Sequence, residues 1–112
     1  MIQLPVPGVL AAARAAGIAR VVTVGTTLES SRWSARCAAE HDEVYAAVAI
    51  HPNDTTAAVA AAVTAEAVLA EIEALASLPR VVAVGETGLD YYRDHAAPDV
   101  QRWWFREHIK IA

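Results

Sequence analysis

The stretch that decides the fold runs from Arg80 to Tyr92 and reads RVVAVGETGLDYY. After the initial arginine the chain is apolar and rich in valine, and Gly85 closes the run. A short run of this kind that ends at a glycine predicts a buried β-strand over Arg80–Val84. Glu86 stands directly after this strand, so a carboxylate is expected where the chain leaves the core.

Two earlier stretches have the same character. Arg20–Val24 is rich in valine and is followed by a glycine, and Val44–Ile50 is a continuous apolar run that stops at His51-Pro52. Proline lacks a backbone N–H and restricts the residue before it, so the second run is not expected to continue as a strand. The sequence therefore predicts three short strands that are apolar on both faces.

Helical patterns lie before, between and after these strands. Thr26 and Glu29 have the spacing of a capping box, in which two side chains satisfy the first backbone N–H groups of a helix. Gly17 suits the left-handed residue that follows the end of a helix. The expected helices are Val9–Ala16, a helix that begins at Thr26 and ends near Glu40, Thr64–Ser77, and a helix from Pro98 to the last residue.

This alternation of helices and strands predicts an α/β fold. Apolar strands separated by amphipathic helices favour a parallel sheet with right-handed crossovers. The length of 112 residues suits a single domain. Because the chain starts just before one helix and stops inside another, we expect residues 1–112 to form one partial domain that is truncated at both ends.

The composition narrows the function classes. The sequence has 9 Lys and Arg residues against 13 Asp and Glu residues, a formal net charge of −4. This balance argues against a broad basic surface for nucleic acid, although a nuclease can meet phosphate through a metal ion. No apolar run is longer than Ala57–Val63, which is far shorter than the ~20 residues of a membrane span. With no signal-peptide pattern, we expect a cytoplasmic location, no membrane contact and no obligate protein partner.

Polar residues follow all three predicted strands. Parallel strands place their carboxyl ends at one edge of a sheet, where the functional groups of α/β folds gather. The candidate groups there are the imidazole of His51 and the carboxylates of Glu86 and Asp90. Imidazole and carboxylate groups are ligands of divalent metals. The sequence therefore predicts a polar pocket at this edge.

Each candidate residue also has a simpler structural interpretation. Glu86 could cap the strand end or pair with an arginine, since a buried carboxylate needs a partner. His51 could bond to the backbone of a His-Pro turn, and Asp90 could be a turn residue. Tyr92 could stack on a nucleic-acid base or pack within its loop, and Arg93 could contact phosphate or remain solvated.

The run VAVGETGLDYY, Val82 to Tyr92, resembles the TatD family of metal-dependent deoxyribonucleases. The resemblance covers nearly the whole chain from about Ile18 onward, and the run around Glu86 is its most specific part. Further segments that match the family in order are Val24-Gly25-Thr26-Thr27, Ala49-Ile50-His51-Pro52, and Gln101-Arg102 followed by Phe105.

The resemblance implies a (β/α)₈ TIM barrel of the amidohydrolase-like, metal-dependent hydrolase type, of which this chain supplies roughly strands two to four. It also implies cleavage of DNA phosphodiester bonds with one or two divalent ions, Mg²⁺ or Mn²⁺. Glu86 is then expected to be a metal-bridging ligand and His51 a catalytic residue near the substrate phosphate. Asp90 is expected to support the loop or the metal ligands, and Tyr92 and Arg93 are grouped with it as candidate substrate-binding residues.

The chain departs from the family pattern in its metal ligands. The family usually begins with a strand that ends in His-x-His, and residues 1–6 contain no histidine. Two later histidines and a late aspartate would lie beyond residue 112, since such barrels have ~250 residues. Glu86 and His51 alone cannot satisfy the about six ligands of Mg²⁺ or Mn²⁺, so the 112 residues are expected to be inactive in isolation. The alternative function is a non-catalytic α/β module or pseudoenzyme that acts by binding protein.

Overall fold

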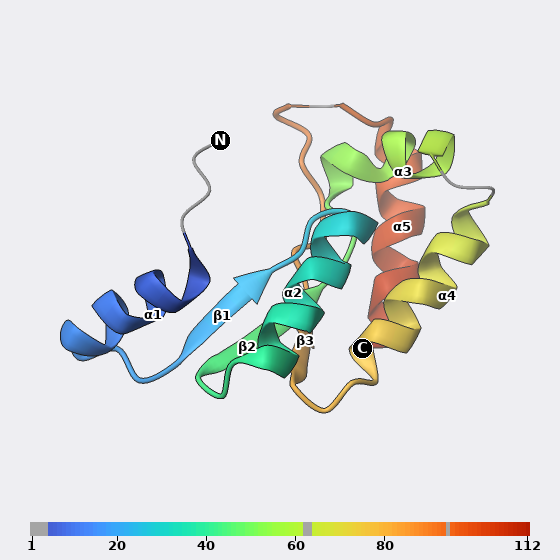
Figure 1. Cartoon of the computed structure of the whole chain (residues 1–112). Coiled ribbons are helices and arrows are strands. Elements are labelled where there is room, and N and C mark those ends of the chain that lie inside the picture. The colour runs from blue at the N-terminus through green and yellow to red at the C-terminus, as the bar shows by residue number, and fades with distance from the viewer. Residues whose placement is uncertain (1–4, 62–63, 94) are drawn as a thin grey trace.

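The computed structural model describes residues 5–61, 64–93 and 95–112. None of the helices in this part of the chain is long and apolar enough to cross a membrane. The elements follow one another in the order α1 (Val6–Ala15), β1 (Val21–Val24), α2 (Leu28–Glu40), β2 (Val44–Val48), a 3₁₀ turn η1 (Pro52–Asp54), α3 (Thr55–Ala61), α4 (Ala65–Ala76), β3 (Val81–Val84) and α5 (Pro98–Ile111) (Figure 1).

The three strands form one parallel sheet in the order β1-β2-β3. Val21 of β1 pairs with Val44 of β2, and Val48 of β2 pairs with Val84 of β3. The register of β3 contains one extra residue, Val82, as in a β-bulge. The predicted α/β class with a parallel sheet is confirmed.

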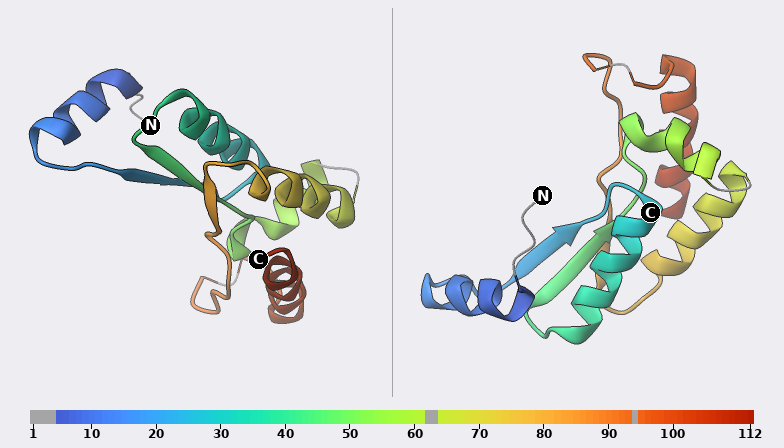
Figure 2. Two further views of the ribbon diagram at one scale, coloured as in Figure 1. Left: turned by 90° about the horizontal axis from the view of Figure 1, so that it is seen from below. Right: turned by 45° about the horizontal axis from the view of Figure 1, so that its top comes forward.

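Two apolar clusters fill the space between the sheet and the helices. The larger one joins β2 and the chain just after it to α4 and α5, and it contains Val48, Ile50, Val68, Leu69, Ile72 and Trp104. The smaller one joins α1, α2 and β2, and it contains Leu10, Cys37, Ala38, Val44 and Ala46. Full burial of a large aliphatic side chain contributes about 1.5–3 kcal/mol relative to exposure. The helices α2, α4 and α5 gather on one side of the strands (Figure 2).

The opposite face of the sheet is open in the described part of the chain. Val22 and Val24 of β1 are 53% and 48% exposed, and Val82 of β3 is 58% exposed. Thr23, between the two exposed valines, points the other way, and its Oγ1 lies 3.0 Å from Oγ of Ser34 in α2. Strands of a parallel sheet are normally covered on both faces. The valines on the open face are therefore available to pack against a further layer.

The predicted capping box of Thr26 and Glu29 is wrong by one residue. The N-cap of α2 is Thr27, whose Oγ1 accepts a hydrogen bond from the N–H of Ser30 at 3.1 Å. In return, the hydroxyl of Ser30 accepts a hydrogen bond from the N–H of Thr27 at 2.9 Å. Serine at the third helical position closes the box in place of the longer glutamate, and Glu29 stays exposed.

Helix α3 was not predicted, whereas the start of α4 was. Oγ1 of the fully buried Thr55 donates to the carbonyl oxygen of Pro52 at 3.0 Å, which leads the chain from η1 into α3. The sequence of α3 is rich in alanine, the best helix former, but it has no stripe of large apolar residues to mark it. Thr64 caps α4 as predicted, because its side chain accepts a hydrogen bond from the N–H of Ala67.

Candidate functional site

The carboxyl ends of the three strands meet at one rim, as the sequence predicts. The backbone N–H of Glu86, after β3, donates to the carbonyl oxygen of Gly25, after β1, at 3.0 Å. The backbone N–H of His51, after β2, donates to the carbonyl oxygen of Thr26 at 2.8 Å. The first bond joins the ends of β1 and β3, the two outer strands, and the second joins the ends of β1 and β2. Contact between the ends of the outer strands requires a curved sheet of the kind that builds a barrel wall.

His51 and Glu86 face each other at this rim. Nε2 of His51 lies 3.5 Å from Oε2 of Glu86. The side chain of Glu86 is 60% exposed and that of His51 is 21% exposed, so solvent reaches the pair. Among the described residues His51, and not an arginine, lies within 4 Å of the Glu86 carboxylate, so the arginine partner that the sequence left open is not found.

The ring of His51 is oriented by its own turn. Nδ1 accepts a hydrogen bond from the backbone N–H of Asn53 at 3.1 Å. A ring nitrogen that accepts carries no proton, so the neutral imidazole has its proton on Nε2. The turn role predicted as the simpler interpretation is therefore present, and it leaves the N–H group of the ring on Nε2, the atom 3.5 Å from Glu86.

Asp90 connects the loop after β3 to the loop after β2. Its Oδ1 accepts a hydrogen bond from the backbone N–H of Arg93 at 3.0 Å, and its Oδ2 accepts one from Nδ2 of Asn53 at 2.9 Å. The Arg93 N–H and the Asn53 side chain hold the pKa of Asp90 below its ordinary value, because they stabilise the ionised carboxylate. Both oxygens are engaged, so Asp90 is suited to holding the loop.

Tyr92 and Arg93 project from the same loop into solvent. Tyr92 is 95% exposed, so the alternative in which its ring packs within the loop is not found. The side chain of Arg93 is exposed, and its described contact with the rim is through its backbone N–H. Their exposure leaves both side chains able to meet a substrate, and their role as substrate-binding residues stays a prediction.

Two buried side chains form hydrogen bonds with the backbone between β2 and the rim. Ser31 of α2 donates its hydroxyl to the carbonyl oxygen of Ala49 and accepts from the N–H of Ala49, both at 3.1 Å. Nε2 of His108 in α5 accepts a hydrogen bond from the N–H of Ile50 at 3.0 Å. The backbone groups of Ala49 and Ile50 thus bond to side chains instead of to a neighbouring strand. For this reason β2 ends at Val48 and not at Ile50 as predicted.

His108, Gln101 and Asn53 were not among the predicted site residues, although Asn53 lies in the predicted polar loop after the second strand. His108 and Gln101 are fully buried, and with Trp104 they share the inner face of α5. Polar residues at the buried positions of an amphipathic helix need hydrogen-bond partners, and that pattern was a usable signal. Asn53 stands in a turn, where asparagine is common, so its sequence gives no comparable signal.

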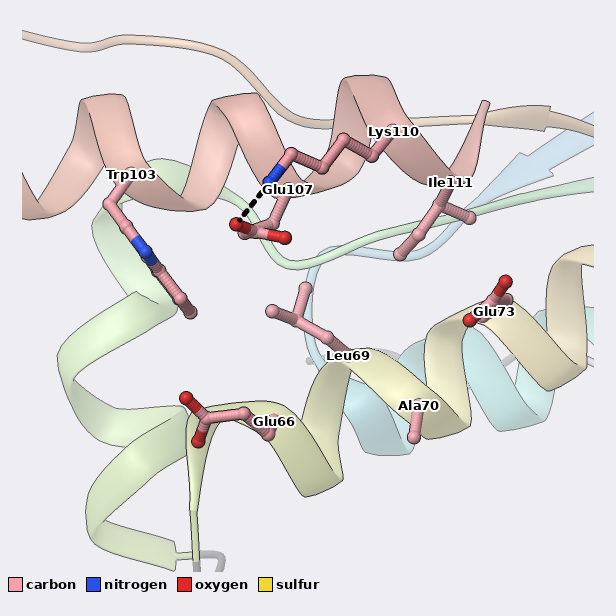
Figure 3. A pocket seen from close by; sticks show the side chains of 8 residues that line it. All are labelled: Glu66, Leu69, Ala70, Glu73, Trp103, Glu107, Lys110 and Ile111. Atoms are coloured by element: carbon pink, nitrogen blue, oxygen red, sulfur yellow. Dashed lines mark hydrogen bonds and ion pairs between the residues drawn. The ribbon is translucent and has the colours of Figure 1, made fainter.

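Two hollows among the described residues are lined by neither His51 nor Glu86. One of about 410 Å³ lies between α4 and α5 and is drawn in Figure 3. Leu69 and Trp103 point toward it from opposite helices, and Lys110 bonds to Glu107 at its edge at 3.0 Å. A second hollow of about 550 Å³ is lined by residues of α2, α3 and α4.

The donor atoms at the rim fit part of a divalent-metal site. The carboxylate of Glu86 is exposed and offers an anionic oxygen, the kind of ligand that Mg²⁺ and Mn²⁺ prefer. Both oxygens of Asp90 are engaged, and Nε2 of neutral His51 carries a proton. In the described ranges no group of three or more His, Cys, Asp or Glu side chains is placed to hold a metal ion. Glu86 can therefore supply one ligand of a site that these residues do not complete.

A curved parallel sheet with helices outside and polar groups at its carboxyl ends defines part of a (β/α)₈ barrel. A family model described as "TatD related DNase" matches residues 5–112. The chain belongs to this TatD-related family. A crystal structure of YJJV, a TatD homolog from Escherichia coli, superposes with a TM-score of 0.76 and 26% identity over 98% of this chain and 42% of that one.

Curated relatives agree with this assignment. An uncharacterized metal-dependent hydrolase TatD of Mycobacterium tuberculosis is 48% identical over 89% of this chain and 38% of its own length. The 3′-5′ ssDNA/RNA exonuclease TatD of Escherichia coli is 34% identical over 93% of this chain and 38% of its own length. The deoxyribonuclease Tat-D of Schizosaccharomyces pombe is 33% identical over 93% of this chain and 35% of its own length. The chain therefore spans little more than a third of these relatives.

Proposed function

We propose that this chain is the part of a divalent-metal-dependent hydrolase that carries the Glu86 ligand, and that the complete enzyme cleaves DNA phosphodiester bonds from the 3′ end of single strands. The observation that carries the proposal is the His51–Glu86 pair, 3.5 Å apart at the carboxyl ends of β2 and β3. Membership of the TatD-related family supports it. The cytoplasmic location expected from the sequence stays a prediction.

Glu86 and His51 would have different roles in the reaction. The exposed carboxylate of Glu86 would hold Mg²⁺ or Mn²⁺ together with ligands from other residues. A bound divalent ion supplies Lewis-acid stabilisation of phosphate charge and activation of water. The Nε2–H group of His51 would donate a hydrogen bond to a phosphate oxygen of the substrate beside that ion, because Nδ1 already accepts from the Asn53 N–H.

The loop after β3 would contact the strand of DNA outside the reacting phosphate. The exposed ring of Tyr92 offers a stacking surface for a base, and the side chain of Arg93 offers a cation for phosphate. Asp90 would hold this loop in place through its bonds to Asn53 and Arg93. Contacts to phosphate and base faces carry little sequence information, so low sequence selectivity is expected.

A nuclease assay with a matched pair of variants tests this function. In a protein of family length that contains this stretch, single-stranded DNA labelled at the 5′ end should shorten with Mg²⁺ or Mn²⁺ and stay intact with a chelator. Substitutions of the residues that orient metal ligands lower activity about 10–100-fold. Glu86→Gln changes a proposed ligand itself, so it should lower the rate by a larger factor. Glu66→Gln, an exposed glutamate beside the hollow between α4 and α5, is the control and should retain activity.

The outcomes separate the nuclease from the non-catalytic module. Full activity of the Glu86→Gln protein would remove Glu86 from the site. Absence of hydrolysis by the unmutated long protein would favour the protein-binding alternative, which the incomplete set of metal-binding side chains in the described ranges also supports. Vigorous metal-dependent hydrolysis by the 112 residues alone would contradict the expectation that they are inactive in isolation.

A further inference from the structure

Gln101 lies in α5, yet its side chain reaches the loop that follows Glu86. It is fully buried. Its Oε1 accepts a hydrogen bond from the backbone N–H of Asp90 at 2.7 Å. Its Nε2 donates to the carbonyl oxygens of Ala96 at 2.8 Å and of Asp90 at 3.2 Å. One amide group therefore holds the loop at two points and satisfies both backbone groups of Asp90.

The position of Asp90 is passed on to the loop after β2. Oδ2 of Asp90 accepts from the side-chain amide of Asn53 at 2.9 Å. The backbone N–H of Asn53 in turn donates to Nδ1 of His51 at 3.1 Å. A continuous series of hydrogen bonds thus connects the buried amide in α5 to the ring that faces Glu86.

The residues around Gln101 show that packing alone does not require an amide there. Trp104, one turn further along α5, belongs to the larger apolar cluster. An apolar side chain at position 101 would fill the same space, but it would leave the N–H of Asp90 and the carbonyl oxygen of Ala96 without these partners. The amide at position 101 is therefore explained by its hydrogen bonds to the loop and not by packing in the core.

We infer that Gln101 is a positioning residue, which holds Asp90 and, through Asn53, keeps the ring of His51 oriented with its Nε2–H toward Glu86. The positioning is a property of the chain itself. Its consequence for catalysis rests on the proposed nuclease function. Residues outside the metal ligands that orient reacting groups commonly affect activity without touching substrate.

Nitrogen-15 NMR of the 112-residue chain tests the positioning without an activity measurement. The ring of His51 should show an unprotonated Nδ1 and a protonated Nε2, and the N–H of Asp90 should exchange slowly with solvent. His108 is an internal reference because it has the opposite tautomer, with Nε2 accepting from Ile50 and Nδ1 donating to Trp104. Gln101→Met, which keeps the length but not the amide, should speed Asp90 exchange at least about tenfold and shift the His51 ring signals while those of His108 stay.

Trp104→Phe is the matched control. It changes a buried side chain of the same helix without removing any side-chain bond to the loop, so it should lower the melting temperature and leave the Asp90 and His51 signals in place. Unchanged Asp90 and His51 signals in Gln101→Met would overturn the inference. The two variants are compared at temperatures that lie equally far below their melting temperatures. If the Asp90 exchange rate and the His51 signals change equally in both, the inference is also overturned, because the effect would then come from a general loss of stability.

The consequence for catalysis has its own measurement. In the nuclease assay, Gln101→Met should lower kcat by about 10–100-fold with little change of KM for DNA, because a misoriented His51 affects the reacting phosphate more than binding. If the unmutated protein has no nuclease activity, the proposed function fails, whereas the NMR result still decides whether Gln101 positions the ring.

Discussion

At the end of β1, Gly25 leaves no room for a side chain. A Cβ at this position would lie 2.7 Å from Cα of Ser31, and closer still to its hydroxyl oxygen. That hydroxyl is bonded to both backbone groups of Ala49, so it cannot move away without leaving them unpaired. The close approach of α2 to the strand end, and not the backbone dihedral of the glycine, explains why a glycine stands here.

Gly25→Ala should therefore destabilise the chain by about 1–3 kcal/mol or more, since overpacking displaces neighbouring backbone. Urea unfolding followed by circular dichroism measures this. Gly8→Ala is the control, because a Cβ at Gly8 in α1 meets nothing within 4 Å. That change should be neutral or stabilise by about 0.5–1 kcal/mol. Equal stability of the two variants would contradict this account of the strand end.

His108 links the pH dependence of stability to the backbone of the rim. Burial lowers the pKa of His108 below its ordinary value of 6.5. Between these two pKa values the unfolded chain binds a proton and the folded chain does not, so stability falls as the pH drops below 6.5 toward the folded pKa. Protonation would also place a hydrogen on Nε2, which accepts from Ile50.

The free energy of unfolding should thus decrease between about pH 7 and pH 5, as measured by urea titration. His108→Gln should be less stable at neutral pH and should lose part of this pH dependence. His95→Gln, at an exposed position, should retain the dependence of the parent chain. A pH profile that is the same in His108→Gln and in the parent would show that another group is responsible.

At the scale of elements, the start of α2 depends on which threonine caps it. The side chain of Thr27 accepts from the N–H of Ser30, and Ser30 reciprocates. The contribution of Thr26 is made by its backbone, whose carbonyl oxygen accepts from the N–H of His51. The two neighbouring threonines thus have different roles, although sequence spacing alone favours Thr26.

Thr27→Ala should cost about 0.5–2 kcal/mol, the usual penalty for losing an N-cap. Thr26→Ala should cost clearly less, because its backbone bond to the rim survives. Thermal unfolding of both variants, monitored at the helix band, gives the comparison. A larger loss in Thr26→Ala would restore the capping box that the sequence indicated.

At the scale of the whole molecule, the described residues cover one face of the sheet and leave the other open. The exposed valines Val22 and Val24 lie on a parallel sheet whose edges β1 and β3 have no further strand in the described part of the chain. Such faces and edges favour association of one chain with another. The 112-residue chain is therefore expected to self-associate at high concentration.

Val22→Lys should reduce this association, because a charge on the open face must be desolvated when two sheets pack. Sedimentation velocity would show a shift toward the monomer. Val59→Lys is the control, since Val59 is also exposed but lies on α3, away from the sheet. If both changes act alike, added charge and not the open face controls association.

The sequence by itself determined the strands, most of the helices and the candidate pair at the rim. Valine runs closed by Gly25 and Gly85, and by the proline after His51, carry their signal within a few neighbouring residues. Parallel topology then places the residues after the strands at one edge, so His51 and Glu86 could be expected to converge. Helix α3 could not be predicted in this way, because an alanine-rich segment has no stripe of large apolar residues.

Only the tertiary structure decided which groups hold that pair in place. Gln101 reaches Asp90, Ser31 reaches Ala49, and His108 reaches Ile50, over separations of 11, 18 and 58 residues. No local pattern encodes such partners, because a buried polar side chain bonds whatever backbone group the packing of the helices brings to it. The sequence set the kinds of residue at the rim, and the packing of α2 and α5 against the strand ends fixed their orientation.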